Sequence, residues 1–243
     1  MTCVRMLYMI KLENITYKVM VDGQEKLILD NISCQFEDGV VTAITGQNGS
    51  GKSTLTKIIA GIIKPTSGKV YFNGVDITEK TIDQRANMGI NYAFQQPVAF
   101  RGITVKELID LALKEKTSVS KACEYLSKVG ICAKEYINRE FDKTLSGGEQ
   151  KRIELALAVA KSGSALIFDE PEAGIDLWSF ERLNNLIEKG KTYLIVSHQE
   201  RLLERADRIL VLSSGKVQMY GTSKMVLKKL GSLSCARIGG GKQ

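Results

Sequence analysis

The sequence predicts an α/β fold with a mostly parallel sheet, an N-terminal antiparallel β part and a helical insert. Short β-branched apolar runs alternate with helical segments along most of the chain, which is typical of parallel sheets. Residues 10–36 instead alternate apolar and polar side chains, as half-buried antiparallel strands do. From about 104 to 138, helical spacing continues without a strand-like run, which indicates the insert.

The same patterns place the individual elements. Before the insert, strands are expected at 10–21, 27–36, 40–44 and 69–73, with a helix at 53–62. After it, we expect a helix at 148–161, a strand at 164–169, a helix at 179–189 and a strand at 192–197. Two final runs, 209–212 and 216–220, flank Ser213-Ser214-Gly215 and predict a hairpin.

These elements predict one domain over residues 10–230, after an N-terminal extension over 1–9. Its α/β core would comprise 10–94 and 160–230, and its helical subdomain about 95–159. A flexible basic tail is expected over 231–243, because three consecutive glycines stand near its end.

Composition favours a cytoplasmic globular protein. The 243 residues are 44% hydrophobic and 25% charged, and neither a secretion leader nor a membrane-length apolar run of about 18–20 residues occurs. The five cysteines are scattered without a C-x-x-C pair, which fits a reducing compartment.

The net charge of +7 does not indicate a nucleic-acid partner. Residues 221–243 contain basic side chains and no acidic one, so the rest of the chain is nearly neutral. A nearly neutral body with a basic end lacks the electrostatic footprint that nucleic acid requires.

A P-loop is predicted where the strand at 40–44 meets the following helix. The pattern Gly46-x4-Gly51-Lys52-Ser53 turns backbone N–H groups toward phosphate oxygens, and the helix adds the positive end of its dipole. Lys52 would reach the β- and γ-phosphates, and Ser53 would bind Mg²⁺. The expected nucleotide-binding residues are Gly46, Gln47, Asn48, Gly49, Ser50, Gly51, Lys52, Ser53 and Thr54.

Polar side chains at the ends of three further apolar runs complete a predicted P-loop NTPase site. Asp169 and Glu170 end the strand at 164–169, where Asp169 would bind the metal and Glu170 would activate water. His198 follows the strand at 192–197 and would contact the γ-phosphate. Gln95 follows another apolar run and would reach the metal or the water. The expected catalytic residues are Glu170, His198, Lys52 and Gln95, and the expected Mg²⁺ ligands are Ser53, Gln95 and Asp169.

Over about residues 10–225 the chain resembles the ATP-binding cassette (ABC) ATPases. The resemblance rests on the order of the P-loop, Gln95, the signature run Leu145-Ser146-Gly147-Gly148-Glu149-Gln150, the acidic strand end and His198. It implies ATP and Mg²⁺ as cofactors and a head-to-tail dimer of two ATPase subunits. Ser146, Gly147, Gly148 and Glu149 would then contact ATP held by Lys52 of the other subunit, and Asp176 would lie along the dimer seam. Val19 stands where the family often places an aromatic residue under adenine.

Within that family, short matches resemble the Suf-type iron–sulfur cluster assembly ATPases (SufC-like). They include Phe94-Gln95-Gln96-Pro97-Val98 and the residues Lys151, Arg152 and Glu154 after the signature run, whereas Pro171 is more like transport cassettes. The resemblance implies ATP-driven remodelling of a soluble Suf-type scaffold. The alternative is the ATP-binding subunit of a membrane transporter, docked on a permease. Lys151 either pairs with Glu170 in the resting monomer or is a solvated helix lysine.

Overall fold

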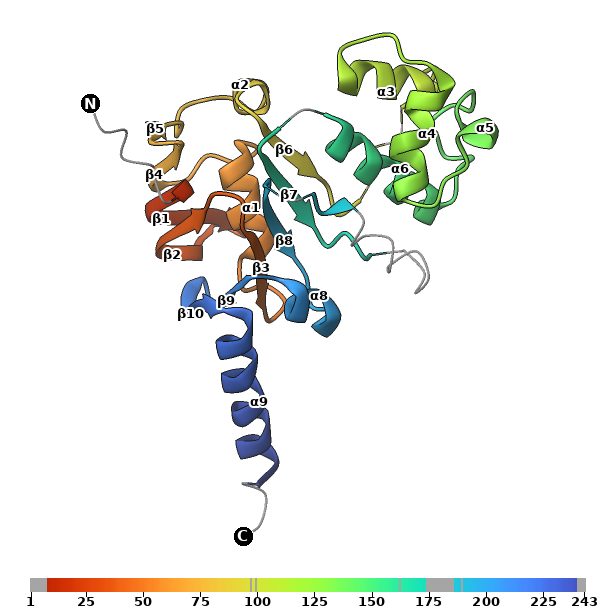
Figure 1. The fold of residues 1–243 in the computed structure, drawn as a ribbon. Helices are drawn as coiled ribbons and strands as arrows, with labels where there is room; N and C mark the ends of the chain where they lie inside the picture. Colours follow the sequence, from red (N-terminus) through yellow and green to blue (C-terminus); the bar gives the residue numbers. More distant parts are fainter. Residues whose placement is uncertain are drawn as a thin grey trace, which may run out of the picture.

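The computed structural model describes residues 8–96, 98, 100–161, 163–173, 186–188 and 190–239, and arranges them as two sheets with surrounding helices (Figure 1). One sheet has the strand order β2-β1-β4-β5, and the other has six strands in the order β10-β9-β3-β8-β7-β6. The predicted α/β fold, with an N-terminal antiparallel part and a helical insert, is confirmed.

The first sheet is antiparallel throughout. Its strands are β1 (Tyr8–Val21), β2 (Gln24–Glu37), β4 (Ser67–Phe72) and β5 (Val75–Asp76). The β1–β2 hairpin turns at Asp22 and Gly23, both with positive φ, 51° and 77°. Two consecutive turn residues with positive φ give the turn a twist that matches the right-handed twist of the flanking strands.

The second sheet is mostly parallel. Its strands are β3 (Val41–Gly46), β6 (Ile90–Ala93), β7 (Ala165–Asp169), β8 (Thr192–Val196), β9 (Arg208–Ser213) and β10 (Lys216–Thr222). Every residue of β7 and β8 is buried. The carboxyl ends of β3, β6, β7 and β8 meet at one edge, because these strands are parallel. That edge is where ligands bind in sheets of this type.

Helices cover both faces of the parallel sheet. They are α1 (Lys52–Ala60), α2 (Ile82–Asn87), α3 (Val105–Leu113), α4 (Val119–Lys128), α5 (Ala133–Tyr136), α6 (Gly147–Ala160), α8 (Glu200–Arg205) and α9 (Ser223–Gly239). Helix α1 fills the space between the two sheets, and its Leu55, Ile58 and Ile59 are fully buried there. The sequence did not predict α2, which is only six residues long.

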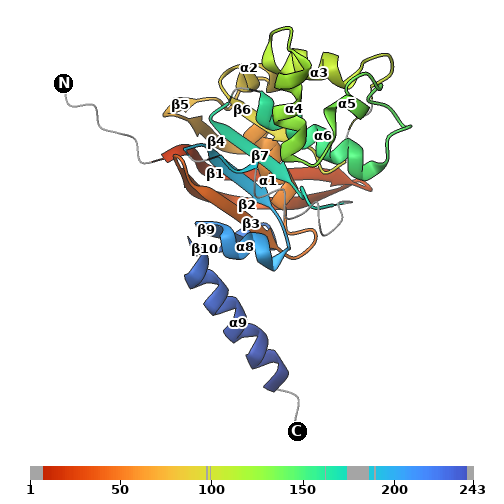
Figure 2. The ribbon, with the colours of Figure 1, turned by 45° about the vertical axis from the view of Figure 1, so that its right-hand side comes forward.

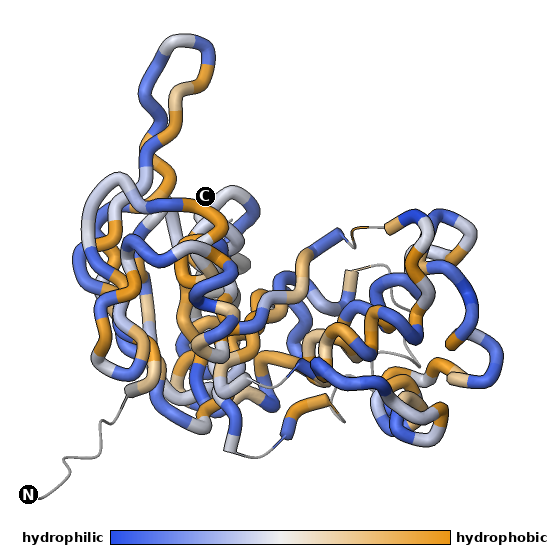
Figure 3. The backbone as a smooth tube through the Cα atoms, turned by 90° about the horizontal axis from the view of Figure 1, so that it is seen from above, coloured by the Kyte–Doolittle hydropathy of each residue, from blue (hydrophilic) through white to orange (hydrophobic). Residues whose placement is uncertain are grey.

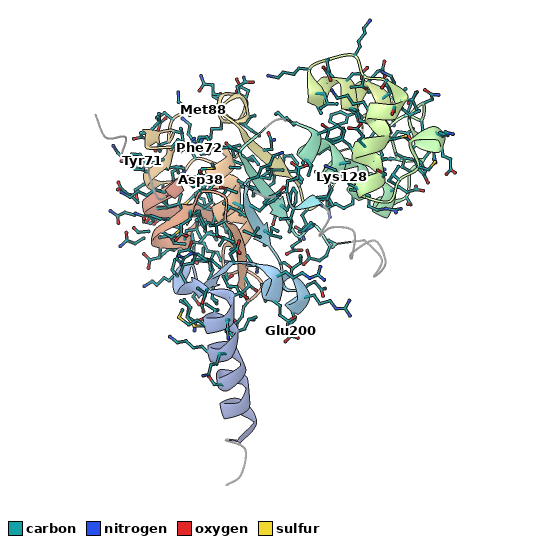
Figure 4. All side chains as sticks on the ribbon, in the orientation of Figure 1. Asp38, Tyr71, Phe72, Met88, Lys128 and Glu200 are labelled. Atoms are coloured by element: carbon teal, nitrogen blue, oxygen red, sulfur yellow. The ribbon has the colours of Figure 1, made fainter. Side chains whose placement is uncertain are left out.

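Helices α3 to α6 form a lobe beside the parallel sheet (Figure 2), and the outer loops of this lobe are mainly hydrophilic (Figure 3). One continuous core joins the lobe to the sheet, from Val105 and Leu126 in the helices to Phe168 and Ile195 in the strands. Lys128, on the side of the lobe toward the sheet (Figure 4), adds an ion pair with Glu188, 2.7 Å long. The lobe is therefore packed on the strands that carry the predicted site.

The chain end differs from the expectation. The flexible tail expected over 231–243 is helical as far as Gly239, as part of α9. Val226 is fully buried, and Leu227 and Leu230 pack against the same small core beneath β9, so the helix starts on an apolar support and continues through Gly231. Most of the helix expected at 179–189 lies outside the described residues. None of the helices among the described residues combines the length and apolar character that a membrane span needs.

Candidate functional site

The predicted P-loop connects β3 to α1 and has the geometry of a phosphate cradle. Gly46 has φ 141°, and a Cβ atom there would lie 2.0 Å from the carbonyl oxygen of Leu212, so only glycine fits. Gly51, with φ 97°, precedes the first turn of α1. The Ser50 Oγ atom is buried and makes no hydrogen bond among the described residues. Backbone N–H groups at a helix start are suited to anions.

Lys52 lies across this loop. Its Nζ atom donates hydrogen bonds to the carbonyl oxygens of Gly46 (2.9 Å) and Gln47 (3.0 Å). Burial lowers the pKa of the Lys52 ammonium, and the nearby carboxylates of Glu170 and Asp169 oppose that shift. The ammonium is thus held over the cradle, with two carboxylates close enough to affect its pKa.

Asp169 links the P-loop helix to two strands. The Ser53 hydroxyl donates to Asp169 Oδ1 at 2.9 Å, and the Tyr92 hydroxyl donates to Oδ2 at 2.8 Å. Asp169 is 1% exposed, and burial raises the pKa of Tyr92, so its hydroxyl remains a donor. Tyr92 was not among the residues predicted for the site. The sequence could have indicated it, because Tyr92 lies on the same apolar run as Gln95, three residues before that glutamine.

Gln95 and Glu170 contact each other directly. The Gln95 Nε2 atom donates to Glu170 Oε2 at 2.6 Å. Glu170 has φ 48°, a left-handed conformation that is unfavourable for a side chain of this kind. Its backbone N–H donates to the Val196 carbonyl oxygen at 3.0 Å, which ties this strained residue to the end of β8.

One cavity of about 710 Å³ brings the predicted residues together. Lys52, Ser53, Gln95, Glu170 and His198 all line it. Burial lowers the pKa of His198, the positive charge of Lys52 lowers it further, and Glu170 opposes both. These effects together favour the uncharged form of the ring. The cavity wall also includes residues 26–28 of β2 and the β9–β10 turn, which the sequence did not predict. Val19 is not part of this wall; it lies on β1 opposite Lys26.

The signature run lies at the start of α6, away from this cavity. Ser146 caps the helix: its side chain accepts from the Glu149 N–H at 3.3 Å, and Glu149 accepts from the Ser146 N–H at 2.7 Å. The described residues that line the P-loop cavity do not include residues 145–150. Asp176 lies outside the described residues.

Comparison with known proteins gives the family. The ABC transporter family model matches residues 29–173. An uncharacterised ABC transporter ATP-binding protein of Methanocaldococcus jannaschii is 40% identical over 82% of this chain and 84% of its own length. The chain belongs to the ABC ATPase family.

Other matches agree with this. The ABC ATPase is 32% identical to the energy-coupling factor transporter ATP-binding protein EcfA2 of Clostridium perfringens, over 92% of this chain and 83% of that protein. It also resembles the solved ATP-binding cassette MJ0796, a dimeric post-hydrolysis state bound to ADP and Pi. The TM-score is 0.79 at 28% identity, over 88% of this chain and 99% of that one.

As an ABC ATPase the chain hydrolyses ATP with Mg²⁺, and its site fits both. The cradle that excludes a Cβ atom at Gly46 and the buried Ser50 hydroxyl suit a phosphate chain. The Ser53 hydroxyl and the Asp169 carboxylate face each other at 2.9 Å and offer the oxygen ligands that Mg²⁺ prefers. Bound Mg²⁺ neutralises charge on the transferred phosphoryl group.

Lys151 corrects the sequence-based hypothesis. It is 1% exposed, so it is not a solvated helix lysine. Its Nζ atom bonds the carbonyl oxygen of Phe94 and contacts Glu154 Oε2 at 3.4 Å, so its carboxylate partner in the ABC ATPase is Glu154, not Glu170. The reason is helix geometry, because Glu154 stands one turn away on the same face of α6.

Proposed function

We propose that this ABC ATPase is the ATP-hydrolysing subunit of a membrane transporter and works as a head-to-tail dimer bound to a permease. The names of two relatives support this, since one is an energy-coupling factor transporter ATP-binding protein and the other a sulfate/thiosulfate import ATP-binding protein. The dimeric cassette MJ0796, a structural neighbour, supports the dimer.

The observation that carries the proposal is an apolar groove between the parallel sheet and the helical lobe. It holds about 450 Å³, and its wall includes Ile82 and Val98, with exposed fractions of 45% and 54%, and Phe100 with 43%. Exposed apolar side chains gathered around a hollow are typical of a protein interface. A short segment of the permease would bury them.

The groove is connected to the ATP site by a hydrogen bond and by the chain itself. Its wall contains Tyr92, whose hydroxyl bonds Asp169, and Phe94, which directly precedes Gln95. A partner seated in the groove would thus touch residues one bond away from the groups that surround ATP. This arrangement suits a subunit whose ATP turnover must respond to a partner.

We infer the following roles within each ATP site. Lys52 neutralises the phosphates, Ser53, Asp169 and Gln95 hold Mg²⁺, Glu170 activates water and His198 contacts the γ-phosphate. Ser146 and Gly148 of the second subunit close the site, with Gly147, Glu149 and Asp176 beside them. The signature run is not part of the wall of its own P-loop cavity, which supports a contact across the dimer.

A Suf-type scaffold remains the second candidate partner. It is favoured by Lys151 and Glu154, which are part of the SufC-like matches, and by the non-aromatic Val19 at the position where the family often stacks an aromatic residue on adenine. The SufC-like lysine led to the hypothesis that Lys151 pairs with Glu170, whereas Lys151 pairs with Glu154. The names of these two transporter relatives also favour the permease.

Photo-crosslinking in the native host tests the proposal. Phe100 in the groove is replaced with a benzophenone amino acid, and Val75, 50% exposed on the antiparallel sheet, is the matched control. We expect Phe100, but not Val75, to crosslink to a polytopic membrane protein. Crosslinking of Phe100 to a soluble scaffold would support the second candidate instead. Equal crosslinking from both positions would remove the groove as a partner site.

A further inference from the structure

Strand β6 ends at Ala93, and the next residue is held by side chains rather than by the sheet. The Phe94 carbonyl oxygen accepts from Lys151 Nζ, and the Phe94 N–H donates to Glu154 Oε1 at 2.7 Å. Lys151 Nζ also lies 3.4 Å from the Gln95 carbonyl oxygen. Two side chains from one turn of α6 therefore hold both backbone polar groups of Phe94 and reach the next residue.

The two side chains form a buried ion pair. The side chains of Lys151 and Glu154 are 1% and 15% exposed, and their charged atoms lie 3.4 Å apart. Burial lowers the pKa of Lys151 and raises the pKa of Glu154, and each charge counteracts the shift of the other. Apolar residues often replace such pairs without loss of stability, so a charged pair at this place suggests a role in geometry.

The held segment leads directly to the catalytic groups. Gln95 follows Phe94, and its side chain amide donates to Glu170 at 2.6 Å. Gln95 itself is exposed, so its side chain does not fix its own backbone by packing. The backbone bonds from α6 supply that restraint. Helix α6 also begins at the signature run, so one helix carries the signature and restrains Gln95.

We propose that Lys151 and Glu154 are positioning residues for ATP hydrolysis, which hold the backbone of Phe94 and Gln95 so that the Gln95 side chain reaches the catalytic groups. Neither side chain is itself part of the nucleotide cavity wall as it is described. Their loss should therefore slow turnover and leave ATP binding nearly intact. Misplacing a catalytic group by about 1 Å can cost roughly 100-fold in rate.

The structure provides a matched control at the other end of the contact between β6 and α6. Asn91, also on β6 and 3% exposed, donates from Nδ2 to the Lys161 carbonyl oxygen at 2.9 Å and to Ala158 at 3.4 Å. It joins β6 to the end of α6, three residues before Phe94. Asn91→Ala loosens the same two elements without touching the backbone of Phe94 or Gln95.

The experiment compares the full chain with Lys151→Met, Lys151→Met/Glu154→Gln and Asn91→Ala. Steady-state ATPase assays give kcat, KM for ATP and the Mg²⁺ concentration for half activation, and thermal unfolding gives Tm. The double variant has no buried charge and keeps an acceptor for the Phe94 N–H, so it should regain the Tm that Lys151→Met loses. If Lys151→Met does not fold, the double variant serves as the test in its place.

We expect both Lys151 variants to lose about 10-fold or more in kcat, to need more Mg²⁺, and to keep KM for ATP within about twofold. Asn91→Ala should lower Tm and keep kcat within about twofold. A kcat that returns with Tm in the double variant would overturn the proposal, because stability alone would then explain the loss. So would an Asn91→Ala variant with an equal loss of kcat.

Discussion

The carboxyl edge of the parallel sheet and the signature run are built in different ways. At the sheet edge, residues from distant parts of the chain bond one another, as Ser53 does with Asp169 and Gln95 with Glu170. In the signature run, residues 145–150, partners are close in sequence, and Ser146 and Glu149 bond each other around the first turn of α6. The first region is a site assembled by the fold. The second is a local unit formed by residues that are neighbours in sequence.

The largest expected effect separates the chemistry at the sheet edge from binding. Glu170→Gln should reduce kcat by at least about 100-fold, because the proposed general base is lost, while ATP affinity stays close to normal. Equilibrium binding with Mg-ATP and sedimentation measure the two properties. ATP should drive this variant into a stable dimer. A variant that stays monomeric at saturating Mg-ATP, with its natural partner present, contradicts the head-to-tail site.

The next effect tests whether the signature run acts beyond its own helix. Ser146→Ala should lower kcat by about 10-fold, because it removes a group that we propose closes the site of the second subunit. Ser118→Ala is the matched control, since Ser118 caps α4 by accepting from the Lys121 N–H at 3.2 Å. Both substitutions should cost about 1 kcal/mol of stability. Equal ATPase rates for the two variants would reduce Ser146 to a helix cap.

A smaller effect is expected from Tyr92→Phe, which removes one of the two hydroxyl groups that bond Asp169. The carboxylate would keep Ser53, so we expect kcat to fall only severalfold, with more Mg²⁺ needed for half activation. Tyr193→Phe is the control, because the Tyr193 hydroxyl donates to the Leu186 carbonyl oxygen at 2.9 Å in the same sheet. It should affect Tm alone. An unchanged Mg²⁺ requirement in Tyr92→Phe would show that Ser53 suffices to orient Asp169.

The smallest effect concerns pH. Burial and Lys52 lower the pKa of His198, so the unfolded chain takes up a proton before the folded chain does. The stability linked to this ring is present above the unfolded pKa of about 6.5 and is lost as the pH falls below it. The ring is exposed, which limits the change to a few tenths of a kcal/mol. The Tm difference between wild type and His198→Gln should shrink from pH 7.5 to 5.5; a constant difference would refute the shift.

The sequence predicted the parts of the site that depend on local spacing. A glycine-rich loop between a strand and a helix, and carboxylates at a strand end, follow from chain neighbours alone. Lys52, Glu170, Gln95 and His198 were found in this way and line one cavity. Asp169 was also found, and it bonds Ser53 in the wall of that cavity. Their individual roles stay predictions.

Features set by contacts between distant elements were not predictable. Tyr92 meets Asp169 only because β6 pairs with β7. Lys151 had two candidate environments from the sequence and occupies neither, because the packing of α6 on β6 brings it to Phe94. The continuation of α9 also depends on a distant contact, since β9 and α8 supply the surface on which Val226 packs.

The backbone of Glu170 has a consequence for how this protein could evolve. A left-handed glutamate, with φ 48°, costs roughly 1 kcal/mol compared with glycine at the same place. Selection for thermal stability alone would thus favour Glu170→Gly, which removes the carboxylate proposed to activate water. With that role for Glu170, a laboratory lineage selected only for stability at high temperature would evolve toward a more stable protein that binds ATP without hydrolysing it. Retention of Glu170 therefore requires that turnover be selected together with stability.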